Sequence, residues 1–259
     1  MDSNNNDSTA KRKIEIDEED PFATLHISSH EPLEQTTGRT VCSKCKQKRK
    51  FFCYKCYEVM GDRDAIPTVK LPINLVIVRH PTELSSKETS IHAKILAPSQ
   101  VEIFDFPSFP DFSSINPEET LLLFPCDDAK FIEDVDVSKI RRVIAIDSTW
   151  QQSKKILRDD KLKGIQTIKI RSQKTKFWRY QNFGTDHLAT IEAIYYFFRE
   201  YCTSLHKDYN GDMDNLLYYF SYFYKMIQSV YKQDPSRKFP RIQNYIKYDN
   251  NNNQNENAQ

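Results

Sequence analysis

The chain has 259 residues, a formal net charge of +1 and 12% aromatic residues. This length allows one sizeable α/β domain with a small appendage. The sequence contains no apolar run of about 18 residues, which excludes a membrane-spanning helix. It also lacks an apolar signal core at its N-terminus, so we expect an intracellular protein.

Both ends of the chain are polar. Residues 1–37 begin with an Asn-rich and charged stretch, and residues 247–259 are dominated by Asn. We predict both as disordered tails, because such segments bury too little apolar surface to offset the entropy lost on ordering. The cluster at 11–13, Lys-Arg-Lys, is typical either of a weak nuclear localisation signal or of a solvated charge run.

Residues 38–66 are predicted to form a small zinc knuckle. Cys42 and Cys45 form one C-x2-C pair, and Cys53 and Cys56 form another. Two such pairs direct four thiolates at one point, which is the ligand set of a tetrahedral structural zinc site without an open position. The intervening loop carries five Lys or Arg residues beside two Phe residues, at 51 and 52. This composition suits RNA contact as well as a solvated turn over a small core.

From residue 67 to residue 246 we predict a single domain. Apolar runs at 73–80, 101–106, 120–125, 141–147 and 165–170 predict buried strands. A helix is expected within 85–97, with Ser85 as its N-cap, and another is expected after Thr149. Non-alternating strands separated by helices predict an α/β fold, in which a mostly parallel sheet carries helices on both faces.

Two longer helices are predicted toward the C-terminus, at 187–202 and 213–233. The apolar stripe of the first comprises Leu188, Ile191, Ile194, Tyr195, Phe198 and Cys202, and that of the second comprises Leu217, Phe220, Tyr224, Ile227 and Tyr231. Glu192 interrupts the first of these apolar helices. Because a buried Glu needs a partner, we expect it either to pair with a basic residue or to point at a site.

Three clusters of residues lie at the carboxyl ends of predicted strands, at 79–81, 124–126 and 147–150. Ligands of parallel α/β sheets bind outside the carboxyl ends of the strands, so we expect these clusters to share one crevice. The sequence has no G-x-G-x-x-G, P-loop, H-E-x-x-H or G-x-S-x-G motif. These absences argue against a dehydrogenase, an NTPase, a zinc metalloprotease and a common esterase.

Asp147 is the sharpest candidate among these residues. A carboxylate at a strand end can bind a cation or accept a proton. Equally, Asp147, Ser148 or Thr149 could cap the helix that follows. Trp150 suits a core position as well as a ligand platform, and His187 suits the first turn of its helix as well as a general base.

A basic segment runs from Lys154 to Arg179, with ten Lys or Arg residues against two Asp residues. Aromatic side chains are interleaved at its end, which suits an RNA backbone with splayed bases, and a solvated basic face is the alternative. The residues that we predict to bind RNA are Lys154, Lys155, Arg158, Lys174, Lys176, Trp178 and Arg179.

Several blocks of the sequence together resemble the DTW-domain family of tRNA-uridine aminocarboxypropyltransferases. "IDSTWQQSKKIL" is similar to the D-x-T-W signature, and "RHPTELSSKETSIHAKIL", "LLLFPCDDA" and "FWRYQNFGTDHLATIEAIYYF" are similar to other family blocks in the expected order. With the cysteine knuckle, the resemblance spans residues 42 to about 200 and is closest to the eukaryotic branch. Ser148 stands where Gly is more usual in the family, and the Asn-rich tails lie outside the resemblance.

The resemblance implies a SPOUT-like fold with a C-terminal knot for the catalytic domain 67–246. It implies transfer of the 3-amino-3-carboxypropyl group of S-adenosylmethionine to N3 of a uridine in the tRNA D-loop, which gives acp3U and releases methylthioadenosine. The implied partners are thus S-adenosylmethionine, a structural zinc ion and tRNA. We expect no obligate protein partner, and we expect nuclear residence with the cytoplasm as the alternative.

The same resemblance assigns the site residues. Asp147, Thr149 and Trp150 are the catalytic candidates, with Asp147 as the general base or as the anchor for the amino group of the transferred arm. The expected cofactor-binding residues are Phe124, Pro125, Cys126, Asp147, Ser148, Thr149, Trp150, His187, Leu188, Ala189, Thr190 and Glu192. Arg79 and Glu192 are second candidates for binding the two charged ends of the arm.

Two other functions compete with this one. The first is an RNA methyltransferase of the same fold class, which would use the methyl carbon of the same donor. The second is a non-catalytic zinc-ribbon RNA-binding protein, against which the carboxylates Asp147 and Glu192 argue.

Overall fold

A five-stranded parallel sheet forms the centre of the protein in the computed structural model, which describes residues 20–82, 88–177, 187–206 and 208–233. The strand order is β6-β5-β8-β7-β9, and every neighbouring pair is parallel. The strands are β5 (Asn74–Arg79), β6 (Val101–Asp105), β7 (Thr120–Leu123), β8 (Arg142–Asp147) and β9 (Gln166–Ile168). All five predicted strands are confirmed, and so is the α/β class.

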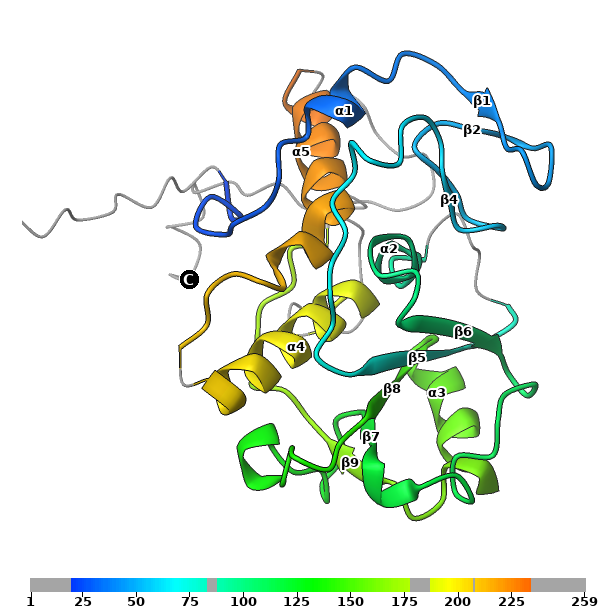
Figure 1. Cartoon of the computed structure of the whole chain (residues 1–259), viewed down its shortest axis with the longest axis vertical. Coiled ribbons are helices and arrows are strands. Elements are labelled where there is room, and N and C mark those ends of the chain that lie inside the picture. The colour runs from blue at the N-terminus through cyan, green and yellow to red at the C-terminus, as the bar shows by residue number, and fades with distance from the viewer. Residues whose placement is uncertain (1–19, 83–87, 178–186, 207, 234–259) are drawn as a thin grey trace, which may run out of the picture.

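Helices cover both faces of the sheet, as the strand pattern predicted. Side chains alternate along β5, so Leu75 and Ile77 belong to a large core cluster, whereas Val76 and Val78 belong to a smaller cluster on the other face. The helices of the large cluster are α2 (Ile91–Leu96), α4 (Thr190–His206) and α5 (Tyr218–Gln233), and the smaller cluster contains Ile156 of α3 (Trp150–Leu157). Figure 1 shows α3 and α4 on opposite sides of β7 and β8.

Three helix boundaries differ from the predictions. α2 begins at Ile91, directly after Ser90, so Ser85 does not cap it. α4 begins at Thr190, which leaves Leu188 outside the helix. The helix predicted from 213 begins as a 3-10 turn, Asp214–Leu217, before α5 continues it. Seven residues of the predicted stripes are buried in the core: Ile191, Ile194, Tyr195, Phe198, Leu217, Phe220 and Tyr224. Cys202 and Ile227 are half-buried against it, and the Tyr231 side chain is not described.

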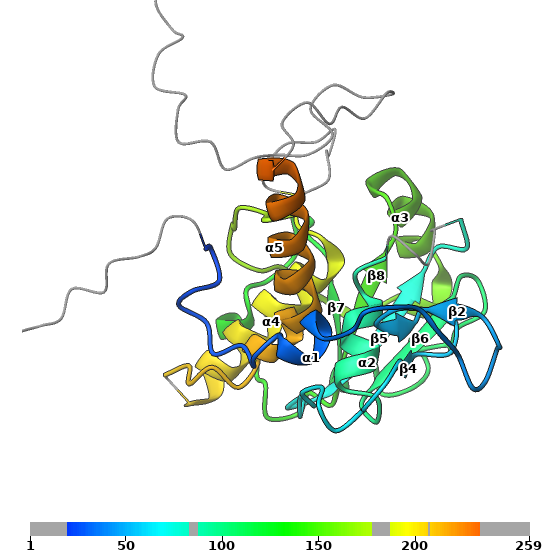
Figure 2. The same ribbon diagram turned by 90° about the horizontal axis from the view of Figure 1, so that it is seen from above.

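The prediction of a disordered N-terminal tail is wrong for residues 20–37. This segment carries α1 (Glu31–Glu34) and packs beside α5 (Figure 2). Phe22 and Leu33 are buried, and the Phe22 ring lies 5.4 Å from the Tyr224 ring. The segment is also fixed by its backbone, since the His26 N–H donates to Asp214 Oδ2 at 2.7 Å. Residues 1–19 and the C-terminal tail lie outside the described residues.

Residues 40–59, which we call the four-cysteine module, form two small hairpins. β1 (Thr40–Val41) pairs with β2 (Lys48–Arg49), and β3 (Phe52–Cys53) pairs with β4 (Glu58–Val59). The Phe51 ring lies 5.3 Å from Tyr222, and the Phe52 ring lies 4.9 Å from Tyr219. Both rings therefore form the small core beneath the module rather than an RNA-stacking platform. No helix in the described part of the chain is long and apolar enough to cross a membrane.

Candidate functional site

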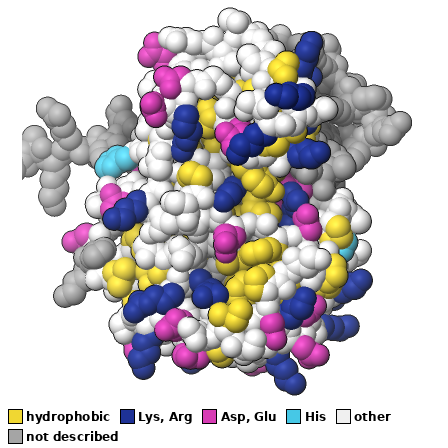
Figure 3. Space-filling model, turned by 45° about the vertical axis from the view of Figure 1, so that its right-hand side comes forward, with side chains coloured by type: hydrophobic (Ala, Val, Ile, Leu, Met, Phe, Trp, Pro, Cys, Tyr) yellow, Lys and Arg dark blue, Asp and Glu magenta, His cyan; other side chains and the backbone are white. Residues whose placement is uncertain are grey.

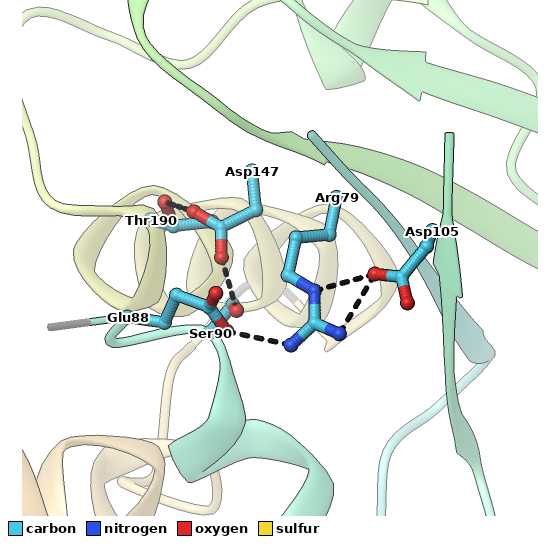
Figure 4. A network of polar contacts seen from close by, with 6 residues as sticks. All are labelled: Arg79, Glu88, Ser90, Asp105, Asp147 and Thr190. Carbon is cyan, nitrogen blue, oxygen red and sulfur yellow. Dashed lines mark hydrogen bonds and ion pairs between the residues drawn. The ribbon is translucent and has the colours of Figure 1, made fainter. Parts of the chain in front are cut away.

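Three charged residues form a row across the carboxyl edge of the sheet. In the strand register, Arg79 at the end of β5 lies opposite Asp105 of β6 and Asp147 of β8. Residues at equivalent register positions project to the same face of a sheet. This face is the one covered by α2 and α4. Figure 4 shows Asp147 beside Thr190 and Ser90, and Arg79 between Glu88 and Asp105.

Asp147 is buried and fully hydrogen-bonded. Its Oδ1 accepts from the Thr190 hydroxyl at 2.6 Å, and its Oδ2 accepts from the Ser90 hydroxyl (Figure 4). Burial raises the pKa of Asp147, while the two hydroxyls and the nearby Arg79 charge oppose that rise. A carboxylate in this setting is suited to proton transfer or to binding a cation.

Asp147 is not the cap of α3. The N-cap residue is Thr149, whose own N–H donates to the side chain of Gln152 at 3.0 Å. This is one half of a capping box. The capping alternative for Asp147 is therefore wrong, and its carboxylate is engaged with α2 and α4 instead.

Arg79 is enclosed by carboxylates of the chain itself. Its Nη1 donates to Glu88 Oε2 at 2.8 Å, and its Nε donates to Asp105 Oδ1 at 2.7 Å. The Arg79 and Glu88 side chains are 13% and 1% exposed. Removing one partner of such a buried ion pair leaves an unpaired buried charge and strongly destabilises the fold. Arg79 therefore connects the ends of β5 and β6 with Glu88.

A pocket of about 270 Å³ opens at the carboxyl ends of β7, β8 and β9. Its lining residues are Leu123, Phe124, Pro125, Ala145, Ile146, Ser148, Trp150, Ser153, Lys169, Ile170, Arg171, Ser172, Gln173, Leu188, Thr190 and Ala193. Six of the predicted cofactor-binding residues are among them: Phe124, Pro125, Ser148, Trp150, Leu188 and Thr190. The other six, Cys126, Asp147, Thr149, His187, Ala189 and Glu192, are not part of the lining.

Trp150 forms a wall of this pocket rather than part of the core. Its side chain is 37% exposed, and its ring lies 5.4 Å from Phe124 and 5.0 Å from His187. An indole that is partly exposed in a pocket offers a flat apolar surface to a ligand. Ser153 and Ile156 are the buried residues of α3.

Glu192 was expected to pair with a basic side chain or to point at a site, and the described residues show neither arrangement. Its Oε1 accepts from the Lys176 N–H at 2.7 Å. Its Oε2 accepts from the Thr175 hydroxyl at 2.6 Å and from the Ala189 N–H at 2.7 Å. Burial raises the pKa of Glu192, and these donors oppose the rise. The side chain thus ties segment 175–176 to the first turn of α4.

Sequence reasoning did not find Ser90 and Glu88, which supply partners to Asp147 and Arg79. Both lie in a polar run that was expected to be helical, and helical periodicity carries no information on a contact with a strand 57 residues away. It also did not find the pocket-lining residues that follow β9, Lys169 to Gln173.

The predicted RNA-binding residues are partly described. Lys154, Lys155, Arg158 and Lys174 are exposed, and Lys176 is half-buried. Trp178 and Arg179 lie outside the described residues. In Figure 3, Lys and Arg side chains gather toward the lower end of the face shown, among Asp and Glu side chains.

The four predicted metal ligands lie together. The sulfur atoms of Cys42, Cys45, Cys53 and Cys56 are all within 4.8 Å of one another. Zn–S bonds of about 2.3 Å in a tetrahedron place sulfurs about 3.8 Å apart, so the cluster has the size of a zinc site. The two C-x2-C turns are alike, because the residue after each pair has a φ of 60° and donates its N–H to the carbonyl of the first Cys.

A parallel sheet whose carboxyl edge carries a pocket and a buried polar network defines a ligand-binding α/β domain. The DTW domain family model matches residues 39–228. The chain therefore belongs to the DTW domain family.

Named relatives cover most of this chain. It is 36% identical over 256 residues to tRNA-uridine aminocarboxypropyltransferase 1 of Xenopus tropicalis, with 80% of this chain and 86% of the relative covered. It is 34% identical over 263 residues to the proteins of the same name from Mus musculus and Homo sapiens, with 83% of this chain and 86% of each relative covered. No solved structure was found to match the chain.

Proposed function

We propose that this chain is a tRNA-uridine aminocarboxypropyltransferase, the activity that its relatives carry in their names. The observation that carries the proposal is the pocket. Its walls include two residues from each of three separate blocks that resemble the family: Phe124 and Pro125, Ser148 and Trp150, and Leu188 and Thr190. The reaction is transfer of the 3-amino-3-carboxypropyl group of S-adenosylmethionine to N3 of a D-loop uridine in tRNA, with methylthioadenosine as the second product.

The pocket residues fit this donor. Leu123, Ala145 and Leu188 give apolar walls. The hydroxyls of Ser148 and Thr190 donate to the Thr149 carbonyl and to Asp147, and their oxygens can still accept a hydrogen bond from a ligand. When bound, the donor supplies an electrophilic carbon beside a positively charged sulfur. The task of the chain is to hold the arm, rather than the methyl group, toward the uridine, and this is a matter of positioning.

The acceptor requires a base, because N3 of uridine is a weakly acidic imide. Asp147 is our candidate, with anchoring of the amino group of the arm as its alternative role. Thr190 supports the connection, because it lines the pocket and donates to Asp147. A carboxylate whose pKa is raised by burial can take a proton at neutral pH more readily than an ordinary one. Arg79 and Glu192 already have partners within the chain, which favours a role in holding the site.

The first experiment uses unmodified tRNA and two labelled donors, one with label on the methyl group and one with label on the carboxyl carbon of the arm. We expect only the carboxyl label to enter the tRNA. Entry of the methyl label alone would identify a methyltransferase of the same class. Entry of neither label would favour the alternative that the chain is a non-catalytic zinc-ribbon RNA-binding protein.

The four-cysteine cluster supports a structural zinc ion. We expect Cys53→Ser to lose the bound metal and to lower the melting temperature by about 5 °C or more, because closing a metal site contributes folding free energy. Metal content by mass spectrometry and thermal unfolding test this. Cys126→Ser is the control, since Cys126 is exposed and lies outside the cluster. Equal metal content in both variants would reject the zinc site.

A SPOUT-like fold with a C-terminal knot is the finer proposal for the sheet. It is supported by the chain path, because β9 is the outermost strand beside β7 whereas α4 contacts β8. The chain therefore returns toward the centre of the sheet after β9. An experimental structure in which residues 169–206 do not pass through a loop formed by another part of the chain would reject the knot.

A tRNA-binding surface along α3 is supported by the exposure of Lys154, Lys155 and Arg158. Replacing the three with Gln should weaken tRNA binding and reduce the slope of log affinity against log salt by about 2 to 3. An unchanged salt slope would place the tRNA elsewhere.

Nuclear residence is supported by the basic cluster at 11–13 alone. A fluorescent fusion with these three residues changed to Ala tests it. If the unchanged fusion stays in the cytoplasm, the proposal is rejected.

A further inference from the structure

The four-cysteine module contacts the candidate site through two side chains that are next to its cysteines. Phe52 precedes Cys53, and its ring lies 5.6 Å from the ring of His92 in α2. Tyr57 follows Cys56, and the charged side chains around its phenol are those of Arg79, Asp105 and Glu88; burial raises the pKa of Tyr57, and the Arg79 charge opposes that rise. In Figure 1 the hairpins of the module lie directly above α2 and the sheet edge.

The conformation of Tyr57 is set by the cysteine turn itself. Its φ is 60°, which is uncommon for a residue with a side chain. This backbone is held by a hydrogen bond of 2.7 Å from the Tyr57 N–H to the Cys53 carbonyl. The C-x2-C turn therefore fixes the backbone from which the Tyr57 side chain leaves, and the charged groups that act on its phenol are those of the candidate site.

The segment between these two contacts, residues 88–92, supplies the partners of the site. Glu88 binds Arg79, and Ser90 donates to Asp147. Thr89 accepts from the Ile191 N–H at the start of α4 at 3.2 Å. A small displacement of this segment would therefore alter the surroundings of Asp147 and the first turn of α4 together.

His92 anchors the end of the segment. It is 3% exposed, and its ring packs against Phe52, Tyr219 and Phe223 at 5.6 to 5.8 Å. Since Phe52 belongs to the module, the module supplies one of the three ring walls that surround His92. The other two walls belong to α5.

We propose that the four-cysteine module is a positioning element of the catalytic site. Phe52 and Tyr57 hold residues 88–92 and Arg79 so that Asp147 keeps its hydroxyl partners. Neither residue lines the pocket, so both are positioning residues and neither is catalytic. The kinetic consequence rests on the transferase function proposed above, whereas the structural coupling does not.

The kinetic test is a double-mutant cycle. We expect Tyr57→Phe to lower kcat by roughly tenfold, with KM for S-adenosylmethionine changed by less than about twofold. Added to Arg79→Lys, it should have little further effect, because that variant has already lost the guanidinium near the Tyr57 phenol. Tyr54→Phe is the matched control, since Tyr54 lies in the same turn but packs under Arg49 at 4.0 Å. Equal effects of the two Tyr variants, or additivity with Arg79→Lys, would overturn the proposal.

The structural test needs no activity. Hydrogen exchange of the His92 and Ala93 amides, which donate to Thr89 and Ser90, is measured in the full chain without donor or tRNA. We expect Phe52→Leu and Tyr57→Phe to speed this exchange at least about fivefold. Phe51→Leu is the control for the first, because the Phe51 ring packs against Tyr222 and Phe223 of α5, whereas the Phe52 ring packs against His92 itself.

Unchanged exchange at His92 and Ala93 in both variants would overturn the coupling, even in an active enzyme. If the unmutated protein transfers no group to tRNA, the proposed function fails, and the exchange measurement still decides whether the module positions residues 88–92.

Discussion

Asp147→Asn is expected to lower the rate of group transfer by at least about 100-fold without unfolding the protein. Asn has the shape of Asp, so it fits between the Ser90 and Thr190 hydroxyls that now donate to the carboxylate. It cannot accept the uridine proton, and it cannot pair with the amino group of the arm. Single-turnover transfer from the carboxyl-labelled donor to tRNA measures the rate, and circular dichroism on the same sample shows whether the variant is folded.

The donor affinity of this variant separates the two roles of Asp147. A general base acts on the acceptor, so its loss should leave the Kd for S-adenosylmethionine unchanged. An anchor for the amino group should raise that Kd by about tenfold or more. Asp136→Asn is the matched control, since Asp136 also accepts from a Ser hydroxyl, at 2.6 Å, but is exposed and remote. If Asp147→Asn retains activity within a few-fold, Asp147 has only a structural role.

The same variant should be more stable than the unmutated protein at neutral pH. Burial raises the pKa of Asp147 in the folded state, so its contribution to stability is complete below the unfolded pKa of about 4 and is lost as the pH rises through the folded value. Asn never ionises and loses nothing. Urea unfolding at pH 8 should therefore favour the variant, and this advantage should shrink toward pH 4. Greater stability of the unmutated protein at pH 8 would contradict the sign of this shift.

The sheet could be predicted because its strands are short apolar runs bounded by polar segments. A parallel strand that is covered on both faces is apolar along its whole length, so it can be recognised without knowing which strands lie beside it. The position of the site followed from the same reasoning, because Asp147, Phe124 and Thr190 fall at strand or helix ends that meet at the carboxyl edge.

The partners of Asp147 could not be predicted, because they are separated from it by 57 and 43 residues. Periodicity describes one element at a time and is silent on which hydroxyl meets which carboxylate. One local signal was available, however. Thr149 and Gln152 have the spacing of a capping box, which would have assigned the cap to Thr149 and left Asp147 for the site.

The predicted boundary of the N-terminal tail was wrong for a related reason. Residues 20–37 are mostly polar, but the two buried apolar residues Phe22 and Leu33 and a few backbone hydrogen bonds fix them against α5 and the 3-10 turn before it. Average composition conceals such isolated anchors.

Glu192→Ala is expected to lower the free energy of unfolding by about 3 kcal/mol or more. The change removes the acceptor of three donors at once: the N–H groups of Lys176 and Ala189 and the hydroxyl of Thr175. The Ala189 donor is buried, so water cannot easily replace the lost partner. Urea unfolding at pH 7 measures the loss.

Glu200→Ala is the matched control on the same helix. Glu200 accepts one backbone hydrogen bond, from the Arg171 N–H at 2.9 Å, and we expect its loss to cost only about 1 kcal/mol. Since Ala189 lies between the pocket residues Leu188 and Thr190, Glu192→Ala should also raise the Kd for S-adenosylmethionine. Glu200→Ala should raise it less, because Glu200 holds one lining residue, Arg171, through a single backbone hydrogen bond. If the two variants lose equal stability and bind the donor equally well, Glu192 does not hold the pocket wall.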